Sequence, residues 1–76
     1  MAGITEISWK KFDTFLRYVG CRFVRSKGDH RVYSRDGLVR PIVIPRVNNI
    51  PVFIIRNNLR VLGIQPQEYL EVLKRM

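Results

Sequence analysis

The sequence predicts a small α+β domain in which one helix precedes three consecutive strands and two helices follow them. Three observations predict this order. Apolar residues recur at helical spacing near both ends of the chain, apolar and polar residues alternate in the middle, and glycine or proline separates the segments. Because the chain has 76 residues, we expect one domain over residues 1–76.

The first helix is predicted over Trp9–Val19. Ser8 is a suitable N-cap residue, because its hydroxyl can accept a hydrogen bond from a free N–H of the first turn. The apolar stripe of this helix consists of Trp9, Phe12, Phe15, Leu16 and Val19. Gly20 stands where the end of a helix favours a left-handed residue. Residues 1–7, before the helix, are expected to form a flexible tail.

Three strands are predicted next, over Cys21–Ser26, Asp29–Ser34 and Val39–Ile44. Asp36 and Gly37 indicate a hairpin between the second and the third strand. Pro41 lacks an N–H donor, so the third strand is expected at a sheet edge or with a bulge at this proline. Each face of the second strand carries one polar and one apolar residue, so the alternation does not decide which face is buried.

Two helices are predicted after the strands. The first of them has Asn49 as its cap and Pro51 in its first turn, and it ends at Gly63. The second begins at Gln65 and Pro66, and its predicted buried residues are Tyr69, Leu70, Leu73 and Met76. The order α-β-β-β-α-α is that of a double-stranded-RNA-binding-like fold with an extra C-terminal helix.

The composition favours a negatively charged partner. Fourteen Lys and Arg residues against six Asp and Glu residues make a formal charge of +8, and ten of the fourteen are arginine. A guanidinium can bind phosphate through two hydrogen bonds and can stack on bases. The charge therefore favours a nucleic acid or an acidic protein as partner over a merely solvated basic surface.

Other classes of protein are disfavoured. Cys21 is the only cysteine, so no intrachain disulfide can form, and we expect a buried residue there rather than a reactive thiol. One cysteine and one histidine do not make a zinc site of the usual ligand number, and we expect no metal and no cofactor. No apolar run approaches the length of a membrane span, and the N-terminus does not resemble a signal peptide, so we expect a cytoplasmic protein without a membrane partner.

His30, the only histidine, is the candidate catalytic residue. It follows Gly28, and a glycine turn leaves room for the backbone of a ligand to approach. Imidazole takes and gives protons near neutral pH, and RNA cleavage needs both steps. A base removes the 2′-OH proton, the oxygen attacks the adjacent phosphate, and an acid protonates the leaving 5′-oxygen. Asp29 and Tyr33 are only weak candidates for a second catalytic group.

Basic residues surround this histidine in the sequence. The candidates for RNA binding, all on the predicted sheet or its turns, are Arg22, Arg25, Lys27, Gly28, Arg31, Arg35 and Arg40. Alternation would place some of them on one open face, which would follow phosphates without reading the base sequence. Arg25 and Lys27 are also candidates for stabilising the charged phosphorane. The second helix offers Arg56, Asn57, Asn58 and Arg60, which suit a nucleic-acid contact and a solvated surface equally well.

These residues resemble those of the HicA (YcfA-like) family of mRNA interferase toxins, and the resemblance covers Ser8 to Leu73. Its most telling motif is a Lys-Gly-Ser-His-like turn, which stands here as Lys27-Gly28-Asp29-His30. The other matching features are a helix that ends at Gly20, the strand Cys21–Arg25, the strand end Ile44-Pro45, and a helix with Ile55-Arg56 that closes at Gly63-Ile64.

The resemblance implies a double-stranded-RNA-binding-like fold and a metal-independent endoribonuclease that cuts mRNA, with His30 as its catalytic residue. It also implies inhibition by a HicB-like antitoxin, which is encoded beside the toxin and covers the His30 surface. The chain departs from the family pattern at several positions. Asp29 replaces the usual serine, Asn58 replaces an apolar residue, and Arg31 and Arg46-Val47 stand where many members carry further histidines.

The sequence therefore favours a toxin of a toxin–antitoxin pair, with His30 as the general acid or base of an endoribonuclease. A non-catalytic, basic RNA-binding module of the same fold is the first alternative, because no clear second catalytic group is present. A protein-interaction domain whose basic face meets an acidic partner is the other alternative.

Overall fold

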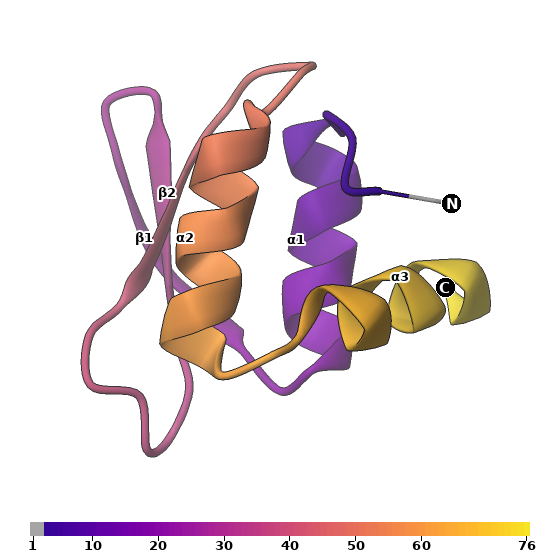
Figure 1. Ribbon diagram of the computed structural model, residues 1–76. Helices are drawn as coiled ribbons and strands as arrows, with labels where there is room; N and C mark the ends of the chain where they lie inside the picture. The colour runs from indigo at the N-terminus through magenta and orange to yellow at the C-terminus, as the bar shows by residue number, and fades with distance from the viewer. Residues whose placement is uncertain (1–2) are drawn as a thin grey trace.

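The computed structural model describes residues 3–76 and contains three helices and three strands. In chain order these are α1 (Trp9–Tyr18), β1 (Arg22–Lys27), β2 (His30–Ser34), β3 (Ile42–Pro45), α2 (Val52–Leu62) and α3 (Pro66–Arg75). Helices α1 and α2 cover one face of the sheet, and α3 packs against both of them near their C-terminal ends (Figure 1). The predicted α+β, double-stranded-RNA-binding-like fold with an extra C-terminal helix is confirmed.

The sheet is antiparallel, with β2 between β1 and β3. The pairing of β1 with β2 shifts register at Val24, which forms a bulge in β1 that the sequence analysis did not predict. On β2, Tyr33 and Arg31 face the helices, because Tyr33 is fully buried in the core. His30 and Val32 therefore face away from the helices, which answers the question that the alternation alone left open.

The core lies between the helices and the inner face of the sheet. Tyr33 packs there with Ile42 and Ile44 of β3, and all three are fully buried. The rings of Phe12, Phe15 and Tyr69 meet on the helical side of the core. Cys21 is buried, as predicted, and burial raises the pKa of its thiol.

The segment before α1 is part of the fold. Ile4 is buried in the core, and Ile7 forms an antiparallel bridge with Ile50. The expectation of a flexible tail over residues 1–7 is therefore wrong for these positions, because apolar residues near the end of the chain find partners in the segment before α2. Met1 and Ala2 lie outside the described residues.

The third strand is shorter and later than predicted. It lies at an edge of the sheet, as expected, and it begins at Ile42, so Pro41 precedes the strand and forms no bulge in it. Asp36 and Gly37 do form a turn, but residues 35–41 make a longer connection than a two-residue hairpin. The N-cap of α2 is Pro51 and not Asn49, and no side chain caps this helix. The fixed φ of proline suits the start of a helix without a capping side chain.

The C-terminal helix buries a different set of residues from the predicted one. Tyr69 and Val72 are buried, whereas Leu70 and Leu73 are half-buried and Met76 is exposed. Burial raises the pKa of the Tyr69 hydroxyl to about 12, so this group stays protonated.

Arg35, which the sequence analysis considered for RNA binding, stabilises the fold through its guanidinium. Its guanidinium donates hydrogen bonds to the carbonyl oxygens of Val19, at 3.0 Å, and Leu62, at 3.1 Å. These carbonyls stand at the C-terminal ends of α1 and α2, where the last turn has no intrahelical donor. A cation at two helix C-termini also interacts favourably with both helix dipoles.

Arg35→Ala is expected to lower the free energy of unfolding by about 2 kcal/mol, because two partly buried carbonyls lose a charged donor. Urea denaturation followed by circular dichroism would measure this change. Arg40→Ala is the matched control, since Arg40 is an exposed arginine in the same connection, and it should change stability by less than about 0.5 kcal/mol. Equal stability of the two variants would contradict the assignment.

Candidate functional site

The sheet face turned away from the helices, here called the open face, gathers basic residues around His30. Cross-strand pairing places Lys27 directly opposite His30 and Arg25 directly opposite Val32. Side chains paired in this way leave the same face, with Cβ atoms about 5 Å apart. Arg22, opposite Ser34, lies farther along the same face.

A hollow of about 430 Å³ lies on the open face. It is lined by Arg25, Lys27, His30, Val32, Pro41 and Val43. The apolar floor comes from Val32 and its cross-strand partner Val43, while the basic rim comes from β1. This volume lies within the range of small-ligand sites. The hollow offers an apolar surface, two cations and an imidazole to one ligand.

The backbone around His30 is well supported. His30 pairs with Lys27 on one side and with Pro45 on the other. The N–H of Arg46 donates a 2.7 Å hydrogen bond to the carbonyl of Asp29, which extends the pairing with the β3 segment to the turn. A catalytic side chain on a strand held from both sides keeps its position better than one on a loop.

Gly28 makes the tight turn before His30. Its φ is +59°, a left-handed conformation that favours glycine, and nothing lies within 4 Å of the position that a Cβ would occupy. The turn is therefore open to solvent beside the histidine. Space there would admit the backbone of a bound strand.

The cations of the open face are weakly neutralised. Arg22 lies 3.8 Å from the carboxylate of Asp36, but both side chains are exposed, and such a pair contributes little. Arg25 and Lys27 form no ion pair with any carboxylate in residues 3–76. Their charges are therefore available to phosphate groups.

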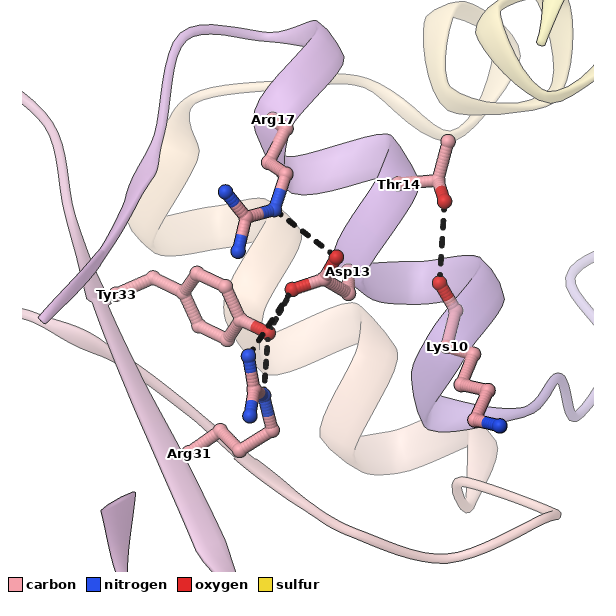
Figure 2. Close-up of polar contacts among 6 residues, drawn as sticks. All are labelled: Lys10, Asp13, Thr14, Arg17, Arg31 and Tyr33. Carbon is pink, nitrogen blue, oxygen red and sulfur yellow. Dashed lines mark hydrogen bonds and ion pairs between the residues drawn. The ribbon is translucent and has the colours of Figure 1, made fainter. Parts of the chain in front are cut away.

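Arg31, which the sequence analysis considered for RNA binding, faces the core side and not the open face. Its guanidinium carbon lies 4.0 Å from the centre of the Phe23 ring, and its Nε donates a 2.9 Å hydrogen bond to the Tyr33 hydroxyl. The Tyr33 hydroxyl in turn donates to Asp13 of α1, which also pairs with Arg17 (Figure 2). We call these four residues, Asp13, Arg17, Arg31 and Tyr33, the Asp13 cluster.

The Asp13 cluster shifts the pKa values of Asp13 and Tyr33 in opposite directions. Burial by itself would raise the pKa of Asp13, but hydrogen bonds from Tyr33 and Arg17 and the charges of Arg17 and Arg31 outweigh it and lower that pKa. Burial raises the pKa of Tyr33, so this hydroxyl keeps the proton that it donates. Tyr33 is thus occupied on the inner face and is not a second catalytic group for His30.

Of the remaining residues that the sequence analysis considered, Arg40 lies on the surface and Asn58 lies inside the fold. Arg40 is exposed and directly precedes Pro41, which lines the hollow. Asn58, whose role was left open, is buried and donates a 3.3 Å hydrogen bond to the carbonyl of Val43. This bond ties α2 to the strand that forms the floor of the hollow.

The sequence analysis missed the apolar floor of Val32 and Val43. A strand sequence shows which residues share a face, but it does not show which residues of the neighbouring strand join them. Residues 3–76 contain no group of three His, Cys, Asp or Glu side chains placed to hold a metal ion. Within the same residues, no helix is both long and apolar enough to cross a membrane.

Comparison with known proteins found one family. Residues 9–64 match the family described as "HicA toxin of bacterial toxin-antitoxin". The matched residues run from α1 to just past α2, so they include the open face and leave out α3. No curated protein and no solved structure matched the chain.

Acidic pH is expected to destabilise the protein through Asp13. The pKa of Asp13 in the folded state lies below its ordinary value of 3.8, so the unfolded state takes up the proton at higher pH. The stabilisation is complete above pH 3.8 and is lost as the pH falls through the lower, folded-state pKa. The difference in unfolding free energy between wild type and Asp13→Asn should therefore be larger at about pH 6 than at about pH 2.5.

Urea denaturation at both pH values would measure this difference. Asp36→Asn is the control, because the Asp36 side chain is fully exposed and should show no comparable change with pH. A difference for Asp13→Asn that does not depend on pH would contradict the ionic role of this carboxylate.

Proposed function

This chain belongs to the HicA family of bacterial toxin–antitoxin toxins, and from this premise we propose that it is a metal-independent endoribonuclease that cuts mRNA. Members of this family are generally ribonucleases. The observation that supports the proposal best is the position of His30, exposed on the open face and directly opposite Lys27. The only imidazole of the chain thus lies beside cations that can hold a phosphate.

The proposed chemistry is a transesterification at phosphorus. His30 takes the proton of a ribose 2′-OH, and the oxygen forms a bond to the adjacent phosphorus while the bond from phosphorus to the 5′-oxygen breaks. The proton held by His30 then passes to the 5′-oxygen, directly or through water. The products are a 2′,3′-cyclic phosphate end and a 5′-hydroxyl end. Imidazole suits both proton transfers because its ordinary pKa lies near neutrality.

The open face supplies the electrostatic part of this reaction. Arg25 and Lys27 rim the hollow beside His30 and would stabilise the extra negative charge on the five-coordinate phosphorus. Arg22 and Arg40, both exposed, would bind neighbouring phosphates. Because Gly28 has no side chain, the turn leaves space for the RNA backbone to reach His30.

Membership in a toxin–antitoxin family implies an antitoxin partner, and we propose a HicB-like protein that covers the open face. Val43 is 42% exposed within the basic rim, so a partner with apolar and acidic side chains would complement this face. Covering His30 would block the substrate. We propose the cytoplasm as the place of action, because mRNA is translated there.

A non-catalytic RNA-binding module is the second candidate function. The observation in its favour is that Tyr33 belongs to the Asp13 cluster on the inner face, which leaves His30 with only Asp29 and Lys27 as neighbouring groups able to act as an acid or base. The two functions share the basic open face and differ only in whether the RNA is cut.

His30→Ala is expected to reduce RNA cleavage by about 10²–10⁴-fold, because one positioned acid or base contributes that much. The measurement is the cleavage of a labelled mRNA by purified wild-type and variant protein in EDTA. Affinity for RNA and the thermal unfolding midpoint should change little, since His30 is exposed. Cleavage by the variant at the wild-type rate would contradict the catalytic role of His30. RNA binding without cleavage by either protein would favour the binding module.

Lys27→Ala is expected to weaken RNA binding about fivefold or more and to make the dependence of affinity on salt less steep, because one phosphate contact is lost. Lys74→Ala removes the same charge from α3, away from the open face, and serves as the control. Fluorescence anisotropy with labelled single-stranded RNA over a series of salt concentrations would measure both effects. Equal affinities of the two variants would show that the open face does not bind the RNA.

A further inference from the structure

Arg46 lies at the same end of the sheet as the candidate site, although the sequence analysis did not include it there. It follows Pro45, which pairs with His30. Its backbone N–H donates to the carbonyl of Asp29, the residue before His30. A ligand on His30 that passes over the end of β3 therefore meets Arg46 next.

The Arg46 side chain is held by an aromatic ring. Its guanidinium carbon lies 5.3 Å from the centre of the Trp9 ring, at the start of α1. The backbone N–H of Trp9 donates a 3.0 Å hydrogen bond to the carbonyl of Val47, which keeps the two segments together. The ammonium of Lys10 lies 5.9 Å from the same ring, so this end of the molecule carries a second cation.

Two arginines approach Trp9, and they differ in what else they contact. Arg31 lies 4.8 Å from the ring centre, but its side chain is 16% exposed and is engaged with Asp13 and Tyr33. Arg46 is exposed and forms no ion pair or side-chain hydrogen bond within residues 3–76. Arg31 therefore has its charge neutralised within the fold, whereas the N–H donors of Arg46 are unused.

We propose that Arg46, held against the Trp9 ring, binds an RNA phosphate next to the phosphate at His30. We call this pair the Trp9–Arg46 subsite. The inference rests on the proposed function insofar as the ligand is RNA. It extends the substrate site from the open face, around the end of β3, to the start of α1.

A guanidinium held near an aromatic ring suits a phosphate better than a free arginine would. Contact with the ring restrains the guanidinium plane, while the N–H groups at its edge remain free to donate. Less side-chain entropy is then lost when a phosphate binds. Asp29, whose carbonyl accepts the Arg46 backbone N–H, is exposed on the turn and forms no ion pair with Arg46.

The test uses His30→Ala protein as the parent, so that RNA binding is measured without cleavage. The probe is a fluorescein-labelled single-stranded RNA oligonucleotide, followed by anisotropy over a series of salt concentrations. Adding Arg46→Ala should weaken binding about tenfold at low salt and make the slope of log K against log salt less steep by about 0.7–1. Arg75→Ala, which removes the same charge from the exposed last turn of α3, should change affinity less than about twofold.

Trp9 is the only tryptophan, so its fluorescence reports on the subsite directly. Unlabelled RNA should change the Trp9 emission and protect the ring from quenching by acrylamide. Trp9→Phe keeps an aromatic side chain but weakens the contact with the guanidinium. It should therefore reduce affinity in the parent and cause no further loss when Arg46→Ala is already present.

The results separate this inference from the proposed function. Equal affinities of the Arg46→Ala and Arg75→Ala variants, with wild-type cleavage intact, would overturn the subsite alone. Additive losses from Trp9→Phe and Arg46→Ala would overturn the role of the ring in holding Arg46. RNA binding that depends on Arg46, without cleavage by the wild type, would support the subsite and overturn the enzyme.

Discussion

The orientation of the sheet depends on Tyr33, whose ring is fully buried in the core and whose hydroxyl contacts Asp13 and Arg31. A buried cation is tolerated only with a partner, and here the carboxylate comes from α1, while the hydroxyl comes from the same strand as the arginine. Since successive side chains of a strand leave opposite faces, an inward Arg31 requires an outward His30. The positions of the Asp13 cluster and of His30 therefore both follow from the same strand register.

The same register assembles the open face. With β2 in the middle, His30 and Val32 receive neighbours from both edge strands: Lys27 and Arg25 from β1, and the residues of β3 from the other side. The side-chain amide of Asn58 in α2 donates a hydrogen bond to the β3 backbone. The family match, over residues 9–64, includes all three paired strands and ends just after α2.

Much of the fold could be predicted from the sequence, because helical periodicity, Ser8, Gly63 and the turn glycines act locally. The proposed site was predicted in part: His30, Arg25 and Lys27 do share one face. The partners of Arg35 and of the two arginines near Trp9 could not be predicted. The sequence around an arginine does not show whether its guanidinium binds carbonyls, a carboxylate or a phosphate. These partners lie far away along the chain.

The sequence by itself determined the element order, the position of the Gly28 turn before His30, the excess of arginine, and the resemblance to HicA toxins. Each of these depends on neighbouring residues or on simple counts. Only the tertiary structure decided which arginines remain available for a ligand. That decision depends on the one partly buried carboxylate within residues 3–76, Asp13, and on two helix ends. These groups bind Arg17, Arg31 and Arg35, whereas Arg25 remains exposed on the open face beside His30.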